Sequence, residues 1–401
     1  MPKKVKKLDK KFIVRDCHFT ISKPLVDYFG RTDSLFELPA VPSDAPVFSF
    51  ALPGSVFDRM RLDNCRNHWW SRVPGSSELT SALSLPTNFD GVFVDMLQRL
   101  QVVSAAVAAS ILFVGCSPGK VDTSVIQRKW LDISYASQSK AQALDIYLPD
   151  SGSGPFPAII SIHGGGFAFG DRRGSDLAAA LNALERGYAV VSIDYRLSGE
   201  AVFPKQIQDV KAAIRYIRAH AAQYNINPEK LAAWGSSAGG NLAALTGVTA
   251  GVKELEDLSQ GNPEQSSRVQ AVVDWFGPVN FLAMDDQFKQ SGINGEKHSI
   301  ADSFESRLLG SNIAEVPDLV KAANPETYIS VESPPFFIQH GTADKNIPVQ
   351  QSEGLAAKLI AAIGEEKVTF MKLEGAKHGG AAFTAPENIR RVLDFLDKNM
   401  K

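Results

Sequence analysis

The sequence predicts an α/β protein in which helices cover both faces of a mostly parallel β-sheet. One observation and one physical argument support this fold class. From about residue 121 onward, apolar runs of strand length alternate with longer stretches of helical periodicity. Alternating strands and helices favour parallel pairing, because each helix returns the chain to the same end of the sheet and buries one of its faces.

Six short apolar runs are expected to form the main strands. They are 158–162, 189–194, 231–234, 269–275, 335–339 and 368–373. Two earlier runs, 130–135 and 143–148, are expected to pair as antiparallel edge strands. The clearest helical patterns are 176–186, 206–224 and 386–399.

The stretch 279–330 separates two of these strands and has an irregular pattern. Two interpretations stay open. It forms either a cap or substrate-binding insertion, or a helical excursion that packs against the sheet. Its phenylalanines Phe281, Phe288 and Phe304 fit either an acyl or aromatic pocket or the core.

Residues 1–95 differ from the rest of the chain. They begin with a basic run, Lys3 to Lys11, and then scatter Pro, Phe, Arg and Asp without sustained periodicity. We expect an irregular, solvated segment, with a basic arm for an acidic surface as the alternative. The net charge of the whole chain is −2, so bulk charge gives no indication of a nucleic-acid partner.

Residues 96–120 have the pattern of a lipoprotein-type signal segment and linker. Arg99 precedes a mostly apolar run, 102–114, which is too short for an ordinary transmembrane helix, and Cys116 follows a small residue. The pattern predicts that Cys116 is the lipidated first residue of a mature protein in the cell envelope, or of a secreted one. The alternative is a buried helix with a free cysteine. Because such signals begin a chain, we hypothesise that translation starts at Met96 and that residues 1–95 are upstream sequence.

Residues 121–401 are the expected catalytic domain, and their most informative segment is the Gly-x-Ser-x-Gly pattern around Ser237. An apolar run leads into it and a helix-compatible run of small residues follows. A nucleophilic serine on a tight strand-to-helix turn needs this context, and Gly235 and Gly239 leave the room that the turn requires.

A serine nucleophile needs a base and a carboxylate. Asp344 follows the predicted strand 335–339, and His378 follows the predicted strand 368–373. Loops that follow parallel strands share one edge of a sheet. The order Ser237, Asp344, His378 therefore predicts a catalytic triad at that edge.

A glycine run supplies candidate oxyanion donors. It extends from Gly164 to Gly166, directly after the predicted strand 158–162. Backbone N–H groups there, with the N–H of Ala238 after the nucleophile, are placed to stabilise a developing oxyanion.

Other residues compete for these roles. His163 is interpreted as ordering the glycine loop, and His340 precedes the acid in the chain, so His378 is preferred as base. Asp274 follows an earlier strand and is the rival to Asp344. Asp194 and Arg196 are expected to pin a loop. The three cysteines lie before residue 121, so the catalytic fold uses no cysteine nucleophile and no disulfide.

With these motifs, the chain resembles the α/β-hydrolase-fold serine esterases that carry a His-Gly-Gly-Gly signature. The group includes hormone-sensitive-lipase-like carboxylesterases and bacterial esterases that remove feruloyl or acetyl groups from plant polysaccharide. The resemblance runs from about Lys129 to the C-terminus. Its motifs are 144–149, 163–166, 194–197, 235–239, 340–344 and 377–379, and the segments 323–328 and 333–336 favour the feruloyl and acetyl-xylan esterase branch.

The resemblance implies a serine carboxylesterase that uses no metal or organic cofactor and acts on a small-molecule or polysaccharide-linked ester. It also implies that Gly165 and Gly166 are the oxyanion donors of the glycine run. Two alternatives stay open, a serine peptidase on the same fold and a catalytically silent binding protein. The sequence does not specify the acyl group or the oligomeric state.

Overall fold

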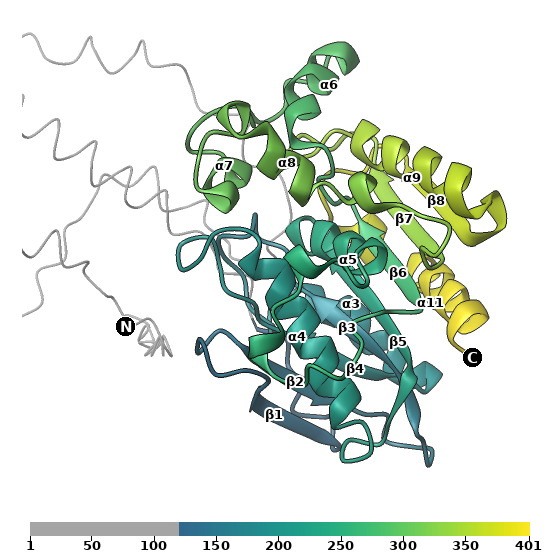
Figure 1. The fold of residues 1–401 in the computed structure, drawn as a ribbon. Helices are drawn as coiled ribbons and strands as arrows, with labels where there is room; N and C mark the ends of the chain where they lie inside the picture. The colour runs from purple at the N-terminus through teal and green to yellow at the C-terminus, as the bar shows by residue number, and fades with distance from the viewer. Residues whose placement is uncertain (1–119) are drawn as a thin grey trace, which may run out of the picture. The chain divides into compact units, whose positions relative to one another are not determined.

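The computed structural model describes residues 120–401. The predictions for the irregular segment 1–95 and for the signal segment with Cys116 lie outside the described residues. The described chain forms an eight-stranded sheet with the order β1-β2-β4-β3-β5-β6-β7-β8 (Figure 1). Strand β2 pairs antiparallel with β1 and β4, and the other neighbouring strands are parallel. The predicted mostly parallel sheet is confirmed.

All eight strands lie where the sequence predicts them. They are β1 (Lys129–Ser134), β2 (Ala143–Tyr147), β3 (Phe156–Ile162), β4 (Ala189–Ile193), β5 (Ile226–Ser236), β6 (Ala271–Trp275), β7 (Phe336–Gly341) and β8 (Val368–Leu373). Strand β5 differs most, because it begins at Ile226, which pairs with Phe156 ahead of the predicted run.

Side chains of the central strands alternate between two hydrophobic clusters, one on each face of the sheet. Ile160 and Ala233 belong to the first cluster, while their neighbours Ile159 and Ala232 belong to the second. Successive strand residues point to opposite faces, so both faces are buried. This burial explains why the strands are continuous apolar runs rather than alternating polar and apolar residues.

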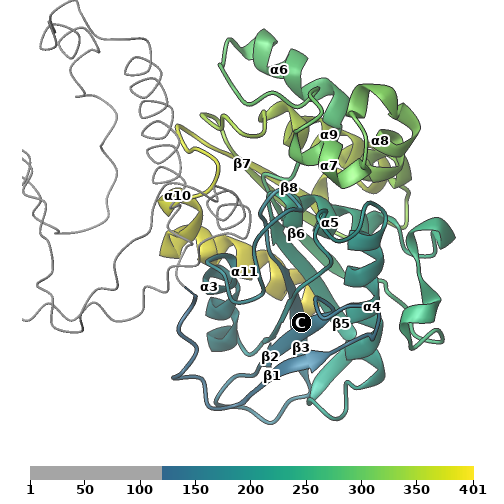
Figure 2. The same ribbon diagram turned by 90° about the vertical axis from the view of Figure 1, so that its left-hand side faces the viewer.

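Helices form a layer on each face, as Figure 2 shows. The first cluster includes residues of α4 (Lys205–Ala219), α5 (Ala238–Val248) and α9 (Gln350–Ile363), and the second includes residues of α3 (Asp176–Leu181) and α11 (Pro386–Met400). In residues 120–401, none of the helices combines the length and the apolar character needed to cross a membrane.

Two predicted helices are shorter in the structure. The prediction 176–186 is α-helical only to Leu181 and continues as a 3-10 helix, because the Asn182 side chain donates back to the carbonyls of Ala178 and Ala179. The prediction 206–224 ends at Ala219, where the imidazole of the next residue, His220, binds the carbonyl of Tyr216.

The stretch 279–330 is mostly helical. It holds α6 (Met284–Ser291), α7 (Phe304–Leu309) and α8 (Pro317–Ala323), together with 3-10 turns at Phe281–Ala283, Ile313–Glu315 and Pro325–Tyr328. Both ribbon views show α6, α7 and α8 gathered at one end of the sheet. Phe281 and Phe288 are buried in packing, whereas Phe304 lines a cavity.

Candidate functional site

Ser237 lies on a strained turn between β5 and α5. Its φ of 54° and ψ of −123° are unusual for a residue with a side chain. The Ser237 N–H donates to the carbonyl of Trp275 over 2.8 Å, and the Ser237 carbonyl accepts the N–H of Asn241 over 3.1 Å. The turn is thus fixed on both sides, as a nucleophile elbow requires.

The glycines that flank Ser237 are required by close backbone contacts. A Cβ on Gly235 would lie 2.0 Å from the carbonyl oxygen of Gly239, and a Cβ on Gly239 would lie 2.2 Å from that of Ile162. Both clashing atoms are backbone oxygens, which cannot rotate away as the end of a flexible side chain could. The sequence pattern around Ser237 therefore has a steric cause.

The structure brings Ser237, His378 and Asp344 together in one chain of hydrogen bonds. His378 Nε2 lies 2.8 Å from Ser237 Oγ, and His378 Nδ1 lies 2.7 Å from Asp344 Oδ2. The three residues follow β5, β8 and β7, so their loops meet at the carboxyl edge of the sheet. The imidazole also packs against the ring of Phe276, with 4.6 Å between ring centroids.

The Asp344 carboxylate is buried and held from several directions. Its Oδ1 accepts the N–H groups of Asn346 at 2.8 Å and Ile347 at 3.0 Å. Burial raises the pKa of Asp344, but the hydrogen bonds from His340 and His378 outweigh burial and hold that pKa well below its usual range. Asp344 is therefore an anion at neutral pH, as the partner of a catalytic histidine must be.

The predicted oxyanion loop lies beside Ser237. A Cβ on Gly164 would lie 3.3 Å from Ser237 Cβ. Within the described residues, the N–H groups of Gly165 and Gly166 donate to no hydrogen bond, and the N–H of Ala238 belongs to the unpaired first turn of α5. The three predicted donors are thus free to bind an oxyanion.

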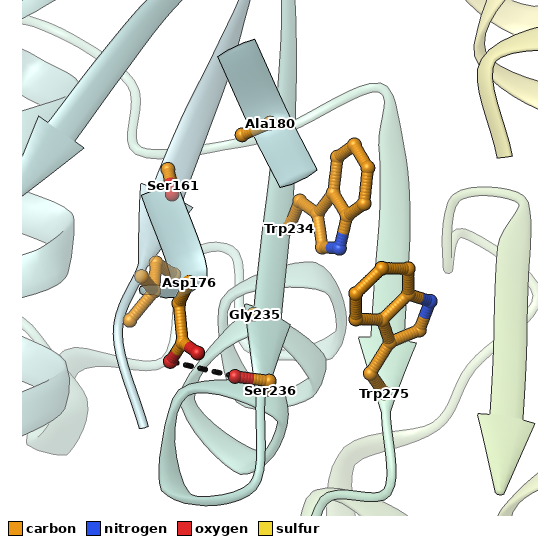
Figure 3. Close-up of a pocket in the computed structure, with 8 residues that line it drawn as sticks. Ser161, Asp176, Ala180, Trp234, Gly235, Ser236 and Trp275 are labelled. Atoms are coloured by element: carbon orange, nitrogen blue, oxygen red, sulfur yellow. Dashed lines mark hydrogen bonds between the residues drawn. The ribbon is translucent and has the colours of Figure 1, made fainter. Parts of the chain in front are cut away.

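Asp176 joins the oxyanion loop to the elbow. One carboxylate oxygen, Oδ2, accepts the N–H of Gly164 at 2.7 Å and the hydroxyl of Ser236 at 2.8 Å. Figure 3 shows this carboxylate facing Ser236 at the base of the elbow. The contact uses the N–H of Gly164, which leaves the later glycines as the available donors.

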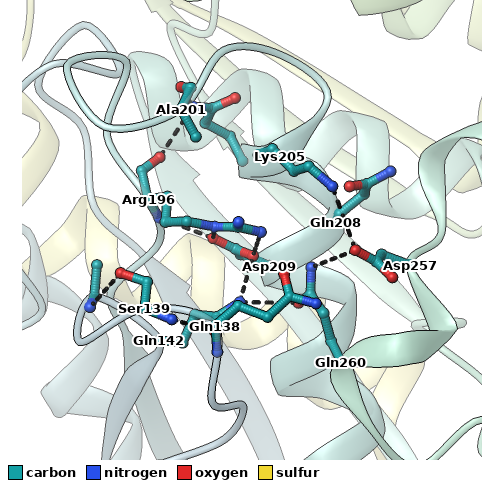
Figure 4. Close-up of polar contacts among 12 residues, drawn as sticks. Gln138, Ser139, Gln142, Arg196, Ala201, Lys205, Gln208, Asp209, Asp257 and Gln260 are labelled. Carbon is teal, nitrogen blue, oxygen red and sulfur yellow. Dashed lines mark hydrogen bonds and ion pairs between the residues drawn. The ribbon is translucent and has the colours of Figure 1, made fainter.

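The loop after β4 is pinned at two points. Asp194 forms an ion pair with Arg172, and Arg196 forms a bidentate ion pair with the buried Asp209 at 2.8 and 2.6 Å. Figure 4 shows the second pair, together with the side chain of Gln142, which donates to Asp209. Asp194 and Arg196 thus pin the loop through separate partners rather than through each other.

The rival residues lie outside the Ser237–His378–Asp344 chain. His163 is buried, bonds the Gly164 carbonyl at 2.7 Å and stacks on Tyr195, so it orders the glycine loop. His340 Nε2 lies 3.3 Å from Asp344 Oδ2, and its ring nitrogens bond Ser352 and the Ile347 carbonyl rather than Ser237. Asp274 is buried beneath the elbow, where its Oδ1 accepts the N–H of Gly277.

A cavity of about 340 Å³ opens onto Ser237 and His378. Its aromatic lining comprises Phe167, Phe169, Phe276 and Phe304, and its polar lining includes Glu296, His298, Glu305 and Asn346. Neither this polar wall nor Asp176 belongs to a recognisable sequence motif, so neither was predicted from the sequence. Among the residues that the structure describes, no group of three or more His, Cys, Asp or Glu side chains is arranged to hold a metal ion.

Comparison with known proteins finds one matching family model and relatives that are named as ester hydrolases. The BD-FAE family model matches residues 144–359. The probable carboxylic ester hydrolase LipM of Mycobacterium tuberculosis is 31% identical over 249 residues, which cover 62% of this chain and 55% of LipM. Esterase LipQ of the same organism is 31% identical over 274 residues, covering 66% of this chain and 61% of LipQ. The chain thus spans little more than half the length of these curated relatives.

The matches to solved structures cover a larger share of the matched chain than the matches to LipM and LipQ do. A structure titled "Truncated form of carbohydrate esterase from gut microbiota" is 34% identical, with a TM-score of 0.64, and the match covers 70% of this chain and 99% of that one. Thermogutta terrifontis esterase 2 phosphonylated by sarin is 26% identical, with a TM-score of 0.55, over 71% of this chain and 97% of that one. The predicted α/β-hydrolase fold is confirmed.

Proposed function

We infer that this chain, which belongs to the BD-FAE family, is a serine carboxylesterase. The observation that carries the proposal is the hydrogen-bonded series from Ser237 through His378 to Asp344, beside free backbone donors in one cavity. The relatives described above are named esterases, which favours ester over peptide substrates and an active enzyme over a silent binding protein.

The proposed reaction follows from these positions. His378 Nε2 accepts the proton of Ser237 Oγ as that oxygen attacks the ester carbonyl carbon. Asp344 accepts the hydrogen bond of the opposite ring nitrogen and stabilises the imidazolium that forms. The N–H groups of Gly165, Gly166 and Ala238 bind the oxyanion of the tetrahedral intermediate.

The second half of the proposed reaction uses the same groups. His378 donates its proton to the leaving alcohol oxygen, and the carbonyl–oxygen bond breaks to leave an acyl group on Ser237. Water, deprotonated by His378, then attacks the acyl-enzyme and releases the acid.

Turnover of p-nitrophenyl acetate tests this function. Ser237→Ala is expected to lower kcat by about 10³-fold or more, because the nucleophile is lost. Ser151→Ala is the matched control, since Ser151 is exposed and does not line the cavity. A folded Ser237→Ala variant with a rate near that of the wild type would overturn the proposal.

We further propose that the substrate is a feruloyl or acetyl ester of plant polysaccharide. The carbohydrate-esterase title of one solved relative supports this class. Rates on methyl ferulate, acetylated xylan and p-nitrophenyl esters of increasing chain length test it. A clear preference for long aliphatic acyl chains over acetyl and feruloyl groups would contradict it.

We also propose that the mature protein is anchored to the cell envelope by a lipid on Cys116. The support is the sequence pattern of residues 96–116 alone. Metabolic labelling with a fatty-acid analogue tests it. We expect the wild-type protein to incorporate the label and the Cys116→Ala variant not to incorporate it. A wild-type protein that stays unlabelled and still carries residues 1–95 would refute the anchor.

A further inference from the structure

We propose that Glu296, Glu305 and Asn346 form the subsite that binds the alcohol part of the ester, and that this alcohol is a neutral, hydroxyl-rich group such as a sugar. The inference rests on the proposed esterase function. According to this proposal, the residues of one wall of the cavity determine which alcohols the site accepts.

This wall is built onto the loop that carries Asp344. Asn346 lies two residues after Asp344, and its side-chain amide donates to Glu296 Oε1 over 2.5 Å. The N–H of Glu296 donates to the carbonyl of Lys345 over 2.8 Å. The segment of Glu296, from the connection between β6 and β7, is thereby fixed beside the loop after β7.

The mechanism determines which part of the ester meets this wall. His378 gives its proton to the leaving alcohol, so the alcohol must lie on the side of His378 and its partner Asp344. Glu296 and Asn346 line the cavity on that side, next to the Asp344 loop. Phe304 belongs to the wall of the oxyanion loop, because a Cβ on Gly166 would lie 2.5 Å from its ring.

His298 and Glu305 form a buried, hydrogen-bonded pair within this wall. His298 Nε2 donates to the carbonyl of Asn346 over 3.0 Å, and Nδ1 lies 3.0 Å from Glu305 Oε2. Burial lowers the pKa of His298, but the hydrogen bond and charge of Glu305 outweigh burial and raise it. The contact with Glu305 thus favours the protonated form of the His298 imidazole, and it holds the Glu305 side chain in a fixed position.

Most of the hydrogen-bonding capacity that is still unused on this wall belongs to acceptor atoms. Both ring nitrogens of His298 are occupied. Within residues 120–401, no hydrogen bond is formed by Glu296 Oε2, Glu305 Oε1 or Asn346 Oδ1. Three fixed acceptors on different elements match a ligand with several O–H donors, and a wall that includes two glutamate side chains disfavours an anionic alcohol.

Two acetate esters with different alcohols test the inference. Both substrates form the same acetyl-enzyme, but p-nitrophenyl acetate has no free hydroxyl, whereas a monoacetylated methyl xyloside has two. The quantity measured is the ratio of kcat/KM for the xyloside to kcat/KM for p-nitrophenyl acetate. Glu296→Ala is expected to lower this ratio about 10- to 100-fold, which is the range for one lost hydrogen bond to a charged group.

Two further variants sharpen the result. Glu296→Gln keeps an acceptor and is expected to recover part of the ratio lost in Glu296→Ala. The matched control, Glu264→Ala, removes an exposed carboxylate that does not line the cavity and is expected to keep the wild-type ratio.

Three results would overturn the inference. The first is a kcat/KM ratio in Glu296→Ala within twofold of the wild-type ratio, and the second is a wild type that cleaves p-nitrophenyl acetate but not the xyloside. The third is a Glu296→Gln variant that loses turnover of acetylcholine but keeps turnover of the other two acetates, which would indicate a cationic alcohol. A wild type that cleaves neither acetate contradicts the proposed function itself, and this result is distinct from the other three.

Discussion

His340 Nε2 lies 3.3 Å from Asp344 Oδ2, the same carboxylate oxygen that His378 Nδ1 contacts at 2.7 Å. His340 is itself fixed, because its ring nitrogens lie 2.9 Å from the carbonyl of Ile347 and 2.7 Å from Ser352 Oγ. The acid of the proposed triad is thus held between two histidines, and only one of them reaches the nucleophile.

Replacing His340 is expected to loosen this arrangement. His340→Gln should lower kcat about 10-fold and the free energy of unfolding by about 1–3 kcal/mol, because buried hydrogen bonds are lost next to the Asp344 loop. Ester turnover and urea unfolding measure the two effects. His220→Gln, at the end of α4, is the control, and an unchanged kcat for His340→Gln would show that His340 does not support Asp344.

Asp274 should make stability depend on pH in a defined direction. Burial raises the pKa of Asp274 to about 6, and the Gly277 N–H and His340 oppose this only in part. For a carboxyl whose pKa is higher in the folded than in the unfolded protein, the contribution to the free energy of unfolding is complete at a pH below the unfolded-state pKa. That contribution is lost as the pH rises through the folded-state pKa.

The wild type should therefore lose roughly 3 kcal/mol of unfolding free energy relative to Asp274→Asn between about pH 4 and pH 7. Urea unfolding at a series of pH values measures this difference. Asp274→Asn should keep its esterase activity, whereas Asp344→Asn should lose about 10⁴-fold in kcat. The reverse pattern of activity would make Asp274 the catalytic acid.

Gly239 should tolerate no side chain. Gly239→Ala is expected to lower the free energy of unfolding by at least about 2 kcal/mol, because its Cβ would collide with the backbone of β3. Gly199→Ala is the matched control, since a Cβ there meets nothing within 4 Å. Thermal unfolding compares the two, and equal midpoints would refute the steric account of the elbow.

Asp176 should affect the transition state more than substrate binding. Asp176→Ala removes the acceptor that joins Gly164 to Ser236, so the oxyanion donors lose their fixed position. We expect kcat to fall about 10-fold with little change in KM, since these donors act on charge that develops in the transition state. Ser236→Ala breaks only one of the two bonds and should have a smaller effect. A raised KM with an unchanged kcat would assign Asp176 to substrate binding instead.

Local patterns in the sequence were sufficient to predict the sheet and the positions of Ser237, Asp344 and His378. Each follows an apolar strand, and parallel strands bring such loops to one edge. The polar wall was not predictable in this way. The contact between Glu296 and Asn346 joins two loops through side chains, and residue 296 lies in a stretch without periodicity. Similarly, the early end of α3 depends on one side chain, Asn182, that competes for backbone carbonyls.

The most direct test of the central claim is covalent labelling with a fluorophosphonate probe, followed by mass spectrometry of the labelled peptide. Such probes trap a serine only where a base and oxyanion donors activate it. We expect a single adduct on Ser237 in the wild type and none in Ser237→Ala. A folded wild type that does not react, or an adduct that persists in Ser237→Ala, would contradict the assignment of Ser237 as the nucleophile.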